Sequence, residues 1–218
     1  MGVMTDPRFD PTSPERWDPR FRTFERMSSG KWYTPGSDEL EAMHARVREV
    51  LREVNALGNV DIPRAGEMLR GILAEGSHVP EWWAPMSVEY GANLSFGEKC
   101  FINTGMTIID CAPVTVGART LFGPNCELIT VGHPVQDLEM RRAGWEIAVP
   151  ITIGESCWFG SRVSVMPGVT IGDRCVIAAG TVVTRDIPDD SLVMGVPGRV
   201  VRTLNDGTSP LERDDIEL

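Results

Sequence analysis

The 218-residue sequence has few aromatic residues, three histidines and no apolar run of membrane-spanning length. A helix that crosses a bilayer needs about 20 predominantly apolar residues. The opening segment, MGVMTDPRFDPTSPERWDPRF, also lacks the apolar core of a secretory signal. We therefore expect no membrane partner and a cytoplasmic location.

Positive charge is scarce as well. The chain has 21 Lys and Arg residues against 31 Asp and Glu residues, which gives a net charge of −10. A chain of this charge is a poor partner for nucleic acid or for an anionic membrane. A phosphorylated ligand would need a local basic patch.

The five cysteines include no CxxC pair. The spacing of a zinc cluster is therefore missing, and three histidines are few for a catalytic zinc site. We expect no metal cofactor.

The chain does contain a regular six-residue repeat between residues 151 and 187. One series of large apolar residues comprises Ile153, Phe159, Val165, Ile171, Ile177 and Val183. A second, smaller series follows four residues later: Cys157, Val163, Val169, Cys175, Thr181 and Ile187. Two apolar series at a fixed offset indicate short strands joined by tight turns, as in a parallel β-helix. The alternative is a sandwich of short strands, which usually has wider and less even spacing.

The repeat also explains most of the cysteines. Cys100, Cys126, Cys157 and Cys175 occupy positions of the small-residue series, so we expect them to be buried as hydrophobic side chains. Only Cys111 lies outside the pattern.

Helical periodicity is confined to the region before the repeat. Apolar residues recur on one face between 37 and 55, with Ser37 as the expected N-cap, and Asp61 and Pro63 open a second helix expected to run through Leu73 to a stop at Gly76. These helices are expected to cover the first coil, whose open end would expose apolar side chains.

The predicted fold is mainly β, a parallel β-helix with an N-terminal α-helical cap. Two interruptions are expected: a bulge at 110–113 and a longer protruding loop at 130–150, where rigid scaffolds commonly place chemistry. After Pro188 we expect the repeat to stop and residues 195–202 to form a final edge segment. The expected organisation is an extended N-terminal arm (1–24), a helical cap (25–80), the β-helix (81–204) and an acidic tail (205–218).

The ordered motifs YGANLSFGEKCFINTGMTIID, VGHPVQ, PITIGESCWFGSRVSVMPGVTIGD, AAGTVVTRDIP and GVPGRVVR resemble the maltose and galactoside O-acetyltransferases. The resemblance covers residues from about 24 to 204, including GKWYTPGSDEL. It implies a left-handed coil, a homotrimer, and sites between subunits where acetyl-CoA meets a sugar hydroxyl. The left hand comes from the resemblance alone, because the general rule for parallel crossovers favours the right hand.

Transfer of an acetyl group from a thioester to an alcohol needs a base for the hydroxyl proton and a donor for the developing oxyanion. His133 stands in the repeat-breaking loop, in a GHPV context that matches the catalytic histidine of the family. Glu146 aligns near an acidic residue of many relatives. It either orients His133 or meets the substrate, or it is a solvated loop charge.

Asn103 and Asp110 resemble acceptor-site positions of the family. Asn103 would donate to a sugar hydroxyl or to the oxyanion, and its structural alternative is a turn residue. Asp110 either binds the acceptor or caps the bulge at 110–113.

For coenzyme A, the resemblance implies binding by Ser161, Ala179, Thr184, Arg185, Arg199 and Arg202. Ser161 follows the turn WFG and Ala179 lies in the turn AAG, where backbone groups can bond the pantetheine arm. Thr184-Arg185 departs from the usual Thr-Lys pair and keeps its positive charge. Arg199 and Arg202 would bind nucleotide phosphates.

The acceptor side departs further from the family. Pro35, His44, Glu89, Phe101 and Cys111 stand where sugar-specific relatives place polar groups, which leaves the acceptor open. Two alternatives follow: acetylation of an amine on an amino sugar, or a coil that is not a transferase. Cys111 is not expected to carry an acyl group, because the implied mechanism is direct transfer.

Overall fold

The computed structural model of the chain describes residues 18–58 and 60–204. Most of the predicted N-terminal arm and the whole predicted acidic tail lie outside these residues. Within them, no helix combines the length and the apolar character that a membrane crossing requires.

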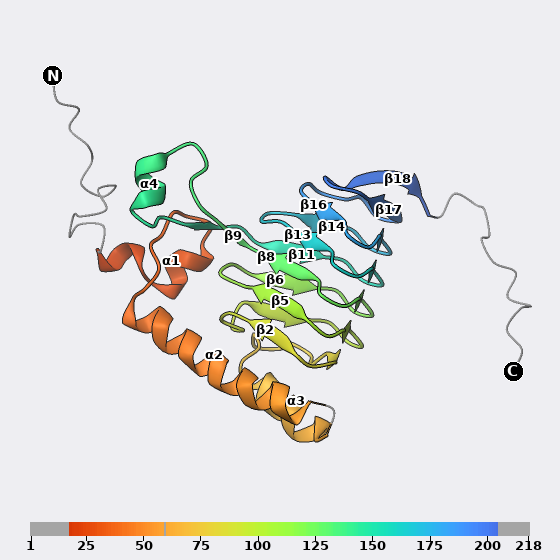
Figure 1. Cartoon of the computed structure of the whole chain (residues 1–218), viewed down its shortest axis with the longest axis horizontal. Coiled ribbons are helices and arrows are strands. Elements are labelled where there is room, and N and C mark those ends of the chain that lie inside the picture. Colours follow the sequence, from red (N-terminus) through yellow and green to blue (C-terminus); the bar gives the residue numbers. More distant parts are fainter. Residues whose placement is uncertain (1–17, 59, 205–218) are drawn as a thin grey trace, which may run out of the picture.

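The body of the protein is a coil of short parallel strands stacked in three faces (Figure 1). Face 1 consists of β3 (Leu94–Phe96), β6 (Val114–Val116), β11 (Ile151–Ile153) and β14 (Thr170–Ile171). Face 2 begins with β1 (Glu81–Trp82), β4 (Phe101–Ile102), β7 (Leu121–Phe122) and β12 (Trp158–Phe159), and continues with β15 (Val176–Ile177), β17 (Ser191–Met194) and β18 (Arg199–Thr203). Face 3 consists of β2 (Met86–Val88), β5 (Met106–Ile109), β8 (Glu127–Ile129), β13 (Ser164–Val165) and β16 (Val182–Val183).

This architecture explains the six-residue period. Each six-residue unit supplies one short strand and one turn, so three units complete a coil and every residue of the large apolar series points inward. Ile153, Phe159 and Val165 lie on faces 1, 2 and 3 of one coil, and all three are buried. The predicted parallel β-helix is therefore confirmed. The left hand of the coil stays a prediction from the family resemblance.

The small-residue series occupies the corners between faces. Cys100, Cys126, Cys157 and Cys175 are buried, as predicted, and each thiol donates to a backbone carbonyl of the next coil. The acceptors are the carbonyls of Gly117, Gly160, Gly172 and Pro188, at 3.1–3.2 Å. These cysteines therefore join neighbouring coils as well as filling the core.

Two helices cover the first coil, and the first begins as predicted. Helix α2 (Asp38–Leu57) starts at Ser37, whose hydroxyl accepts a hydrogen bond from the Leu40 N–H at 3.2 Å. Near its end, the Asn55 side chain exchanges two hydrogen bonds with the Met86 backbone, at 2.9 and 3.0 Å. This amide pairs with β2 as a strand would and fixes the helix to face 3.

Helix α3 (Ile62–Arg70) is capped by Asp61 as predicted, but it ends earlier than the predicted Leu73. The Ala74 N–H donates to the Leu94 carbonyl and the His78 N–H donates to the Phe96 carbonyl. The chain leaves the helix because residues 74–78 already pair with β3.

One further prediction needs correction at the N-terminus. Residues 18–24 do not form an extended arm: they include the 3-10 helix η3 (Pro19–Phe21), and α1 (Phe24–Ser28) starts at residue 24. At the predicted bulge at 110–113, between β5 and β6, Asp110, Cys111 and Ala112 are buried beside the cap. There a second apolar cluster forms around Met27, Tyr33, Leu40, Tyr90, Cys111, Ala112 and Ala148.

The interruption at 130–150 folds into a loop of its own. It contains β9 (Val131–Gly132), α4 (Leu138–Arg142) and β10 (Ile147–Ala148), with β9 and β10 antiparallel. At the other end, the coil runs past Pro188, because β17 still pairs with β15 before β18 folds back antiparallel to it. The repeat therefore continues one strand further than predicted.

Close stacking of the coils predicts a sharp contrast between two glycines. A Cβ at Gly117 would lie 2.5 Å from the Glu155 nitrogen, whereas a Cβ at Gly132 meets nothing within 4 Å. We expect Gly117→Ala to lower the free energy of unfolding by about 1–3 kcal/mol. Gly132→Ala should change it by less than about 1 kcal/mol. Urea unfolding followed by circular dichroism measures both, and equal effects would contradict the stacking argument.

Candidate active site

His133 follows β9 in the protruding loop, and its imidazole is held by a backbone carbonyl. His133 Nδ1 lies 3.1 Å from the Trp145 carbonyl oxygen. A carbonyl oxygen only accepts hydrogen bonds, so Nδ1 carries the proton and Nε2 presents a lone pair. The side chain is 54% exposed. The arrangement offers a proton acceptor at the surface of the loop.

Glu146 lies beside that acceptor. Its Oε1 is 3.7 Å from His133 Nε2, and its side chain is 19% exposed. Its Oε2 accepts a hydrogen bond from the Tyr33 hydroxyl at 2.6 Å. The carboxylate is therefore placed to stabilise a proton gained by Nε2, while the Trp145 carbonyl orients the ring.

A buried polar cluster continues from Tyr33 toward the body of the coil. Burial, followed by the nearby Cys111 thiol and Glu146 carboxylate, raises the pKa of the Tyr33 phenol. Burial also raises the pKa of the Cys111 thiol, which donates to Glu89 Oε2 at 3.5 Å. A thiol held protonated is a poor nucleophile. The pKa of Glu89 is raised mainly by its own burial.

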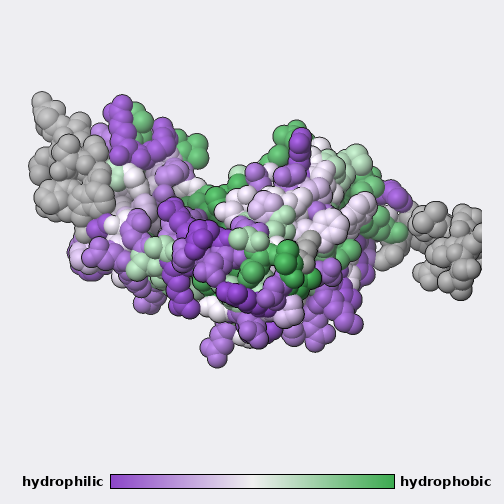
Figure 2. Space-filling model, turned by 60° about the horizontal axis from the view of Figure 1, so that its bottom comes forward, coloured by the Kyte–Doolittle hydropathy of each residue, from purple (hydrophilic) through white to green (hydrophobic). Residues whose placement is uncertain are grey.

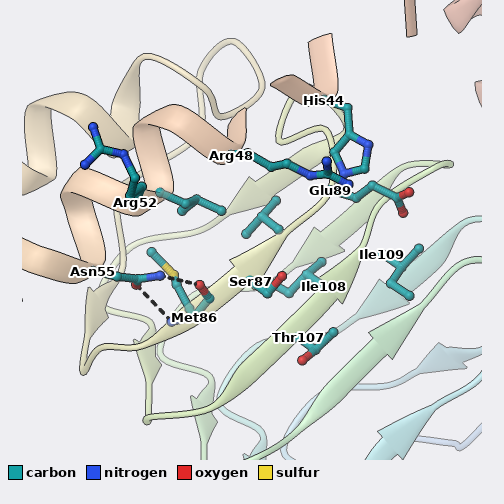
Figure 3. A pocket seen from close by; sticks show the side chains of 12 residues that line it. His44, Arg48, Arg52, Asn55, Met86, Ser87, Glu89, Thr107, Ile108 and Ile109 are labelled. Carbon is teal, nitrogen blue, oxygen red and sulfur yellow. Dashed lines mark hydrogen bonds between the residues drawn. The ribbon is translucent and has the colours of Figure 1, made fainter. Parts of the chain in front are cut away.

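Glu89 also lines a cavity of about 560 Å³ between α2 and face 3 (Figure 3). His44 and Arg48 reach over it from α2, and Ser87 and Thr107 lie along its floor on neighbouring strands (Figure 3). Burial and the neighbouring Arg48 lower the pKa of His44. Two of the positions that depart from the family, His44 and Glu89, thus line one cavity of mixed charge.

The two predicted acceptor residues differ in their surroundings. Asp110 is fully buried, and its Oδ1 accepts from the Tyr90 N–H at 2.8 Å. Burial raises the pKa of this carboxyl group, and its Oδ1 bonds the backbone of the preceding coil. Asn103 Oδ1 accepts from the Thr104 N–H at 2.8 Å, so the side-chain NH₂ is the remaining donor.

The predicted site residues divide between two corners of the coil. Asn103, Ser161 and Ala179 lie at the corner between faces 2 and 3, where Ser161 and Ala179 belong to neighbouring coils joined by Gly180 N–H donating to the Ser161 carbonyl at 2.8 Å. Asp110, His133, Glu146, Thr184 and Arg185 lie at the corner between faces 3 and 1. The four residues of β5, at about 3.3 Å each, separate the corners at the level of Asn103. One chain therefore does not bring Asn103 to His133.

Three predicted phosphate-binding arginines lie near the C-terminal end of the coil. Arg199 and Arg202 are on β18, opposite Met194 and Leu192, and Arg185 follows β16 at the corner between faces 3 and 1. All three are exposed. Among residues 18–58 and 60–204, none of them forms an ion pair with a carboxylate. They are exposed positive charges on a chain that is acidic overall. In the same ranges, no group of three or more His, Cys, Asp or Glu side chains is arranged to hold a metal ion.

Sequence reasoning missed two contributors to the His133 site. The Trp145 carbonyl carries no side-chain signal and could be found only from the fold. Tyr33 stands in the GKWYTPG segment, which the family resemblance already covered, but its partner Glu146 is 113 residues away. Nothing in the local pattern pairs them.

Comparisons with known proteins match both parts of the chain. Residues 26–76 match the family model described as the maltose acetyltransferase hexapeptide capping motif. Residues 150–185 match the hexapeptide repeat of succinyl-transferase. The cap and the coil thus both have the sequence character of hexapeptide-repeat acyltransferases.

Relatives agree over most of the chain. The galactoside O-acetyltransferase of Escherichia coli is 36% identical over 182 residues, covering 84% of this chain and 89% of that protein. The crystal structure of a maltose O-acetyltransferase from Clostridium difficile is 30% identical with a TM-score of 0.81, covering 84% of this chain and 97% of that one. A hexapeptide-repeat acetyltransferase from Vibrio cholerae complexed with acetyl coenzyme A is 34% identical with a TM-score of 0.74, covering 84% and 98%. The chain therefore belongs to the hexapeptide-repeat acyltransferases, in the branch of the maltose and galactoside O-acetyltransferases.

Proposed function

We propose that the protein transfers the acetyl group of acetyl-CoA to a hydroxyl group of a sugar or glycosylated small molecule, with His133 as the general base. The observation that carries the proposal is the fixed imidazole, whose Nδ1 donates to the Trp145 carbonyl and whose Nε2 faces outward beside Glu146. Relatives whose names specify galactoside and maltose O-acetylation support the acceptor class.

The reaction follows from this geometry. His133 Nε2 takes the proton of the acceptor hydroxyl as its oxygen attacks the thioester carbonyl carbon. The carbon–sulfur bond breaks, the ester bond forms, and the sulfur leaves with the proton that the imidazolium returns. Glu146 stabilises the imidazolium between these steps, and the Asn103 NH₂ is the proposed donor to the carbonyl oxygen.

The cofactor side of the proposal rests on small corner residues and on three exposed arginines. Ser161 and Ala179 present backbone groups on neighbouring coils, which suits the amides of a pantetheine arm. Thr184 and the exposed Arg185, Arg199 and Arg202 would meet the nucleotide phosphates. A complex of a 34% identical relative with acetyl-CoA supports the same ligand here.

We further propose that the protein works as a homotrimer, because Asn103 and His133 lie at different corners of one chain. A second copy can bring the two corners together across a shared interface. Face 2 offers such an interface: its outward residues Phe101, Leu121, Trp158, Val176 and Leu192 lie in register down the sheet. Trp158 is 55% exposed and Leu121 43%. In the space-filling view, hydrophobic patches likewise interrupt a largely hydrophilic surface (Figure 2).

Replacing His133 tests the chemistry. We expect His133→Ala to lower kcat by at least about a hundredfold, because general-base catalysis contributes on that scale, with little change in acetyl-CoA affinity. Thiol release with panels of sugar hydroxyl and amine acceptors measures turnover and separates O- from N-acetylation. His78→Ala, at an exposed histidine outside the loop, is the matched control. Near-normal turnover in His133→Ala would show that His133 is not the general base. If calorimetry detects no binding of acetyl-CoA, the protein is a non-catalytic scaffold.

Replacing the terminal arginines tests the phosphate assignment. Arg199→Ala and Arg202→Ala should each raise the KM for acetyl-CoA about tenfold, the scale of one charged hydrogen bond, while kcat changes little. Arg119→Ala, at an exposed arginine on another corner, is the control. Steady-state kinetics with varied acetyl-CoA gives both constants. An unchanged KM in both variants contradicts the assignment.

The apolar column on face 2 predicts the assembly state. Light scattering after gel filtration should give a mass three times that of the 24.0 kDa chain. Trp158→Glu should reduce that mass and the activity together, because a charge would be buried in the interface. Thr152→Glu places the same charge on exposed face 1 of the same coil and should leave the trimer intact. A trimer that tolerates Trp158→Glu would exclude face 2 as the interface.

A further inference from the structure

Tyr33 and Glu146 are joined by three hydrogen bonds although they are 113 residues apart. The Tyr33 N–H donates to the Glu146 carbonyl and the Glu146 N–H donates to the Tyr33 carbonyl, both at 2.9 Å. The third is the bond from the Tyr33 hydroxyl to Glu146 Oε2 at 2.6 Å. The backbone pair adds Tyr33 as a single antiparallel bridge next to β10. The cap is therefore bonded to the loop at Glu146, the residue beside the proposed base His133.

The Tyr33 side chain is suited to act as a fixed donor. It has no exposed surface and packs in the cluster with Met27, Leu40 and Cys111. Its surroundings raise the pKa of the phenol, mainly through burial, so the hydroxyl keeps its proton. A protonated phenol against a carboxylate gives a charge-assisted hydrogen bond, which is stronger than a neutral one.

These hydrogen bonds determine the positions of the Glu146 carboxylate and the Trp145 carbonyl, the two groups beside the His133 ring. With Oε2 of Glu146 held by Tyr33, Oε1 is directed to within 3.7 Å of His133 Nε2. The neighbouring Trp145 supplies the carbonyl that receives Nδ1–H, and its ring packs edge-on against Phe21 at 5.2 Å. The cap thus fixes residues 145 and 146 together.

We propose that Tyr33 is a positioning residue for acetyl transfer, which holds the Glu146 carboxylate beside His133 through its buried hydroxyl. The inference rests on the proposed function. Tyr33 itself reaches neither the reacting atoms nor the solvent, and it acts through Glu146. The N-terminal cap therefore takes part in the chemistry as well as covering the first coil.

The test is Tyr33→Phe, which removes one hydroxyl and keeps the ring. We expect kcat to fall about tenfold, the scale of a hydrogen bond to a charged group, with the KM for acetyl-CoA unchanged. A partly buried carboxylate without its donor either gains a proton or turns toward water, and both remove negative charge from beside Nε2. The acid limb of the kcat/KM pH profile should then move to lower pH, as it should in Glu146→Gln. The other charged side chain bonded next to His133 is Arg141, which donates to the Pro134 and Val135 carbonyls. Neither variant removes these bonds.

A double-variant cycle separates positioning from general stability. If Tyr33 acts through Glu146, Tyr33→Phe should cause little further loss in a Glu146→Gln background. Tyr90→Phe removes a hydroxyl from the same apolar cluster and should leave kcat and the pH profile unchanged. A full additional loss in the double variant, or wild-type kcat in Tyr33→Phe, would overturn the proposal. Full activity of His133→Ala would instead overturn the proposed function, so the two failures are distinguishable.

Discussion

The distance between stacked coils is the constraint on which the rest of the structure depends. At the corner after face 1, successive backbones pass so closely that a Cβ at Gly117 would lie 2.5 Å from the Glu155 nitrogen. Strands held this way cannot rearrange one by one, because each is bonded to coils above and below. Chemistry therefore has to be carried by segments that leave the coil, and the segment between β8 and β11 is the longest of them.

A loop that leaves a rigid coil still has to be held in place. Here the N-terminal cap holds the loop through the hydrogen bond from Tyr33 to Glu146 and the aromatic contact between Phe21 and Trp145. Tyr33 itself belongs to the second apolar cluster, which is separate from the interior of the coil. The cap thus joins the end of the solenoid to the loop that carries His133, which gives it a role beyond covering an open edge.

The division of the predicted site residues between two corners explains why a single coil is an incomplete enzyme in our proposal. Asn103 and Ser161 share one corner, and His133 and Arg185 share another. Because the coil is rigid, one chain cannot bring the corner of Asn103 next to the corner of His133. The apolar column on face 2 and the need to unite the corners therefore support the same conclusion, an assembly of several copies.

The six-residue period alone determined the coil, the inward series and the burial of four cysteines, because a large apolar residue returns at every sixth position from Ile153 to Val183. The sequence also predicted the start of α2 at Ser37 and the loop at 130–150, since capping and broken periodicity are local signals. Only the tertiary structure decided the early end of α3, the burial of Asp110 and the contact between Tyr33 and Glu146. Each of these depends on which distant segment packs against the residue, and a one-dimensional pattern does not encode that pairing.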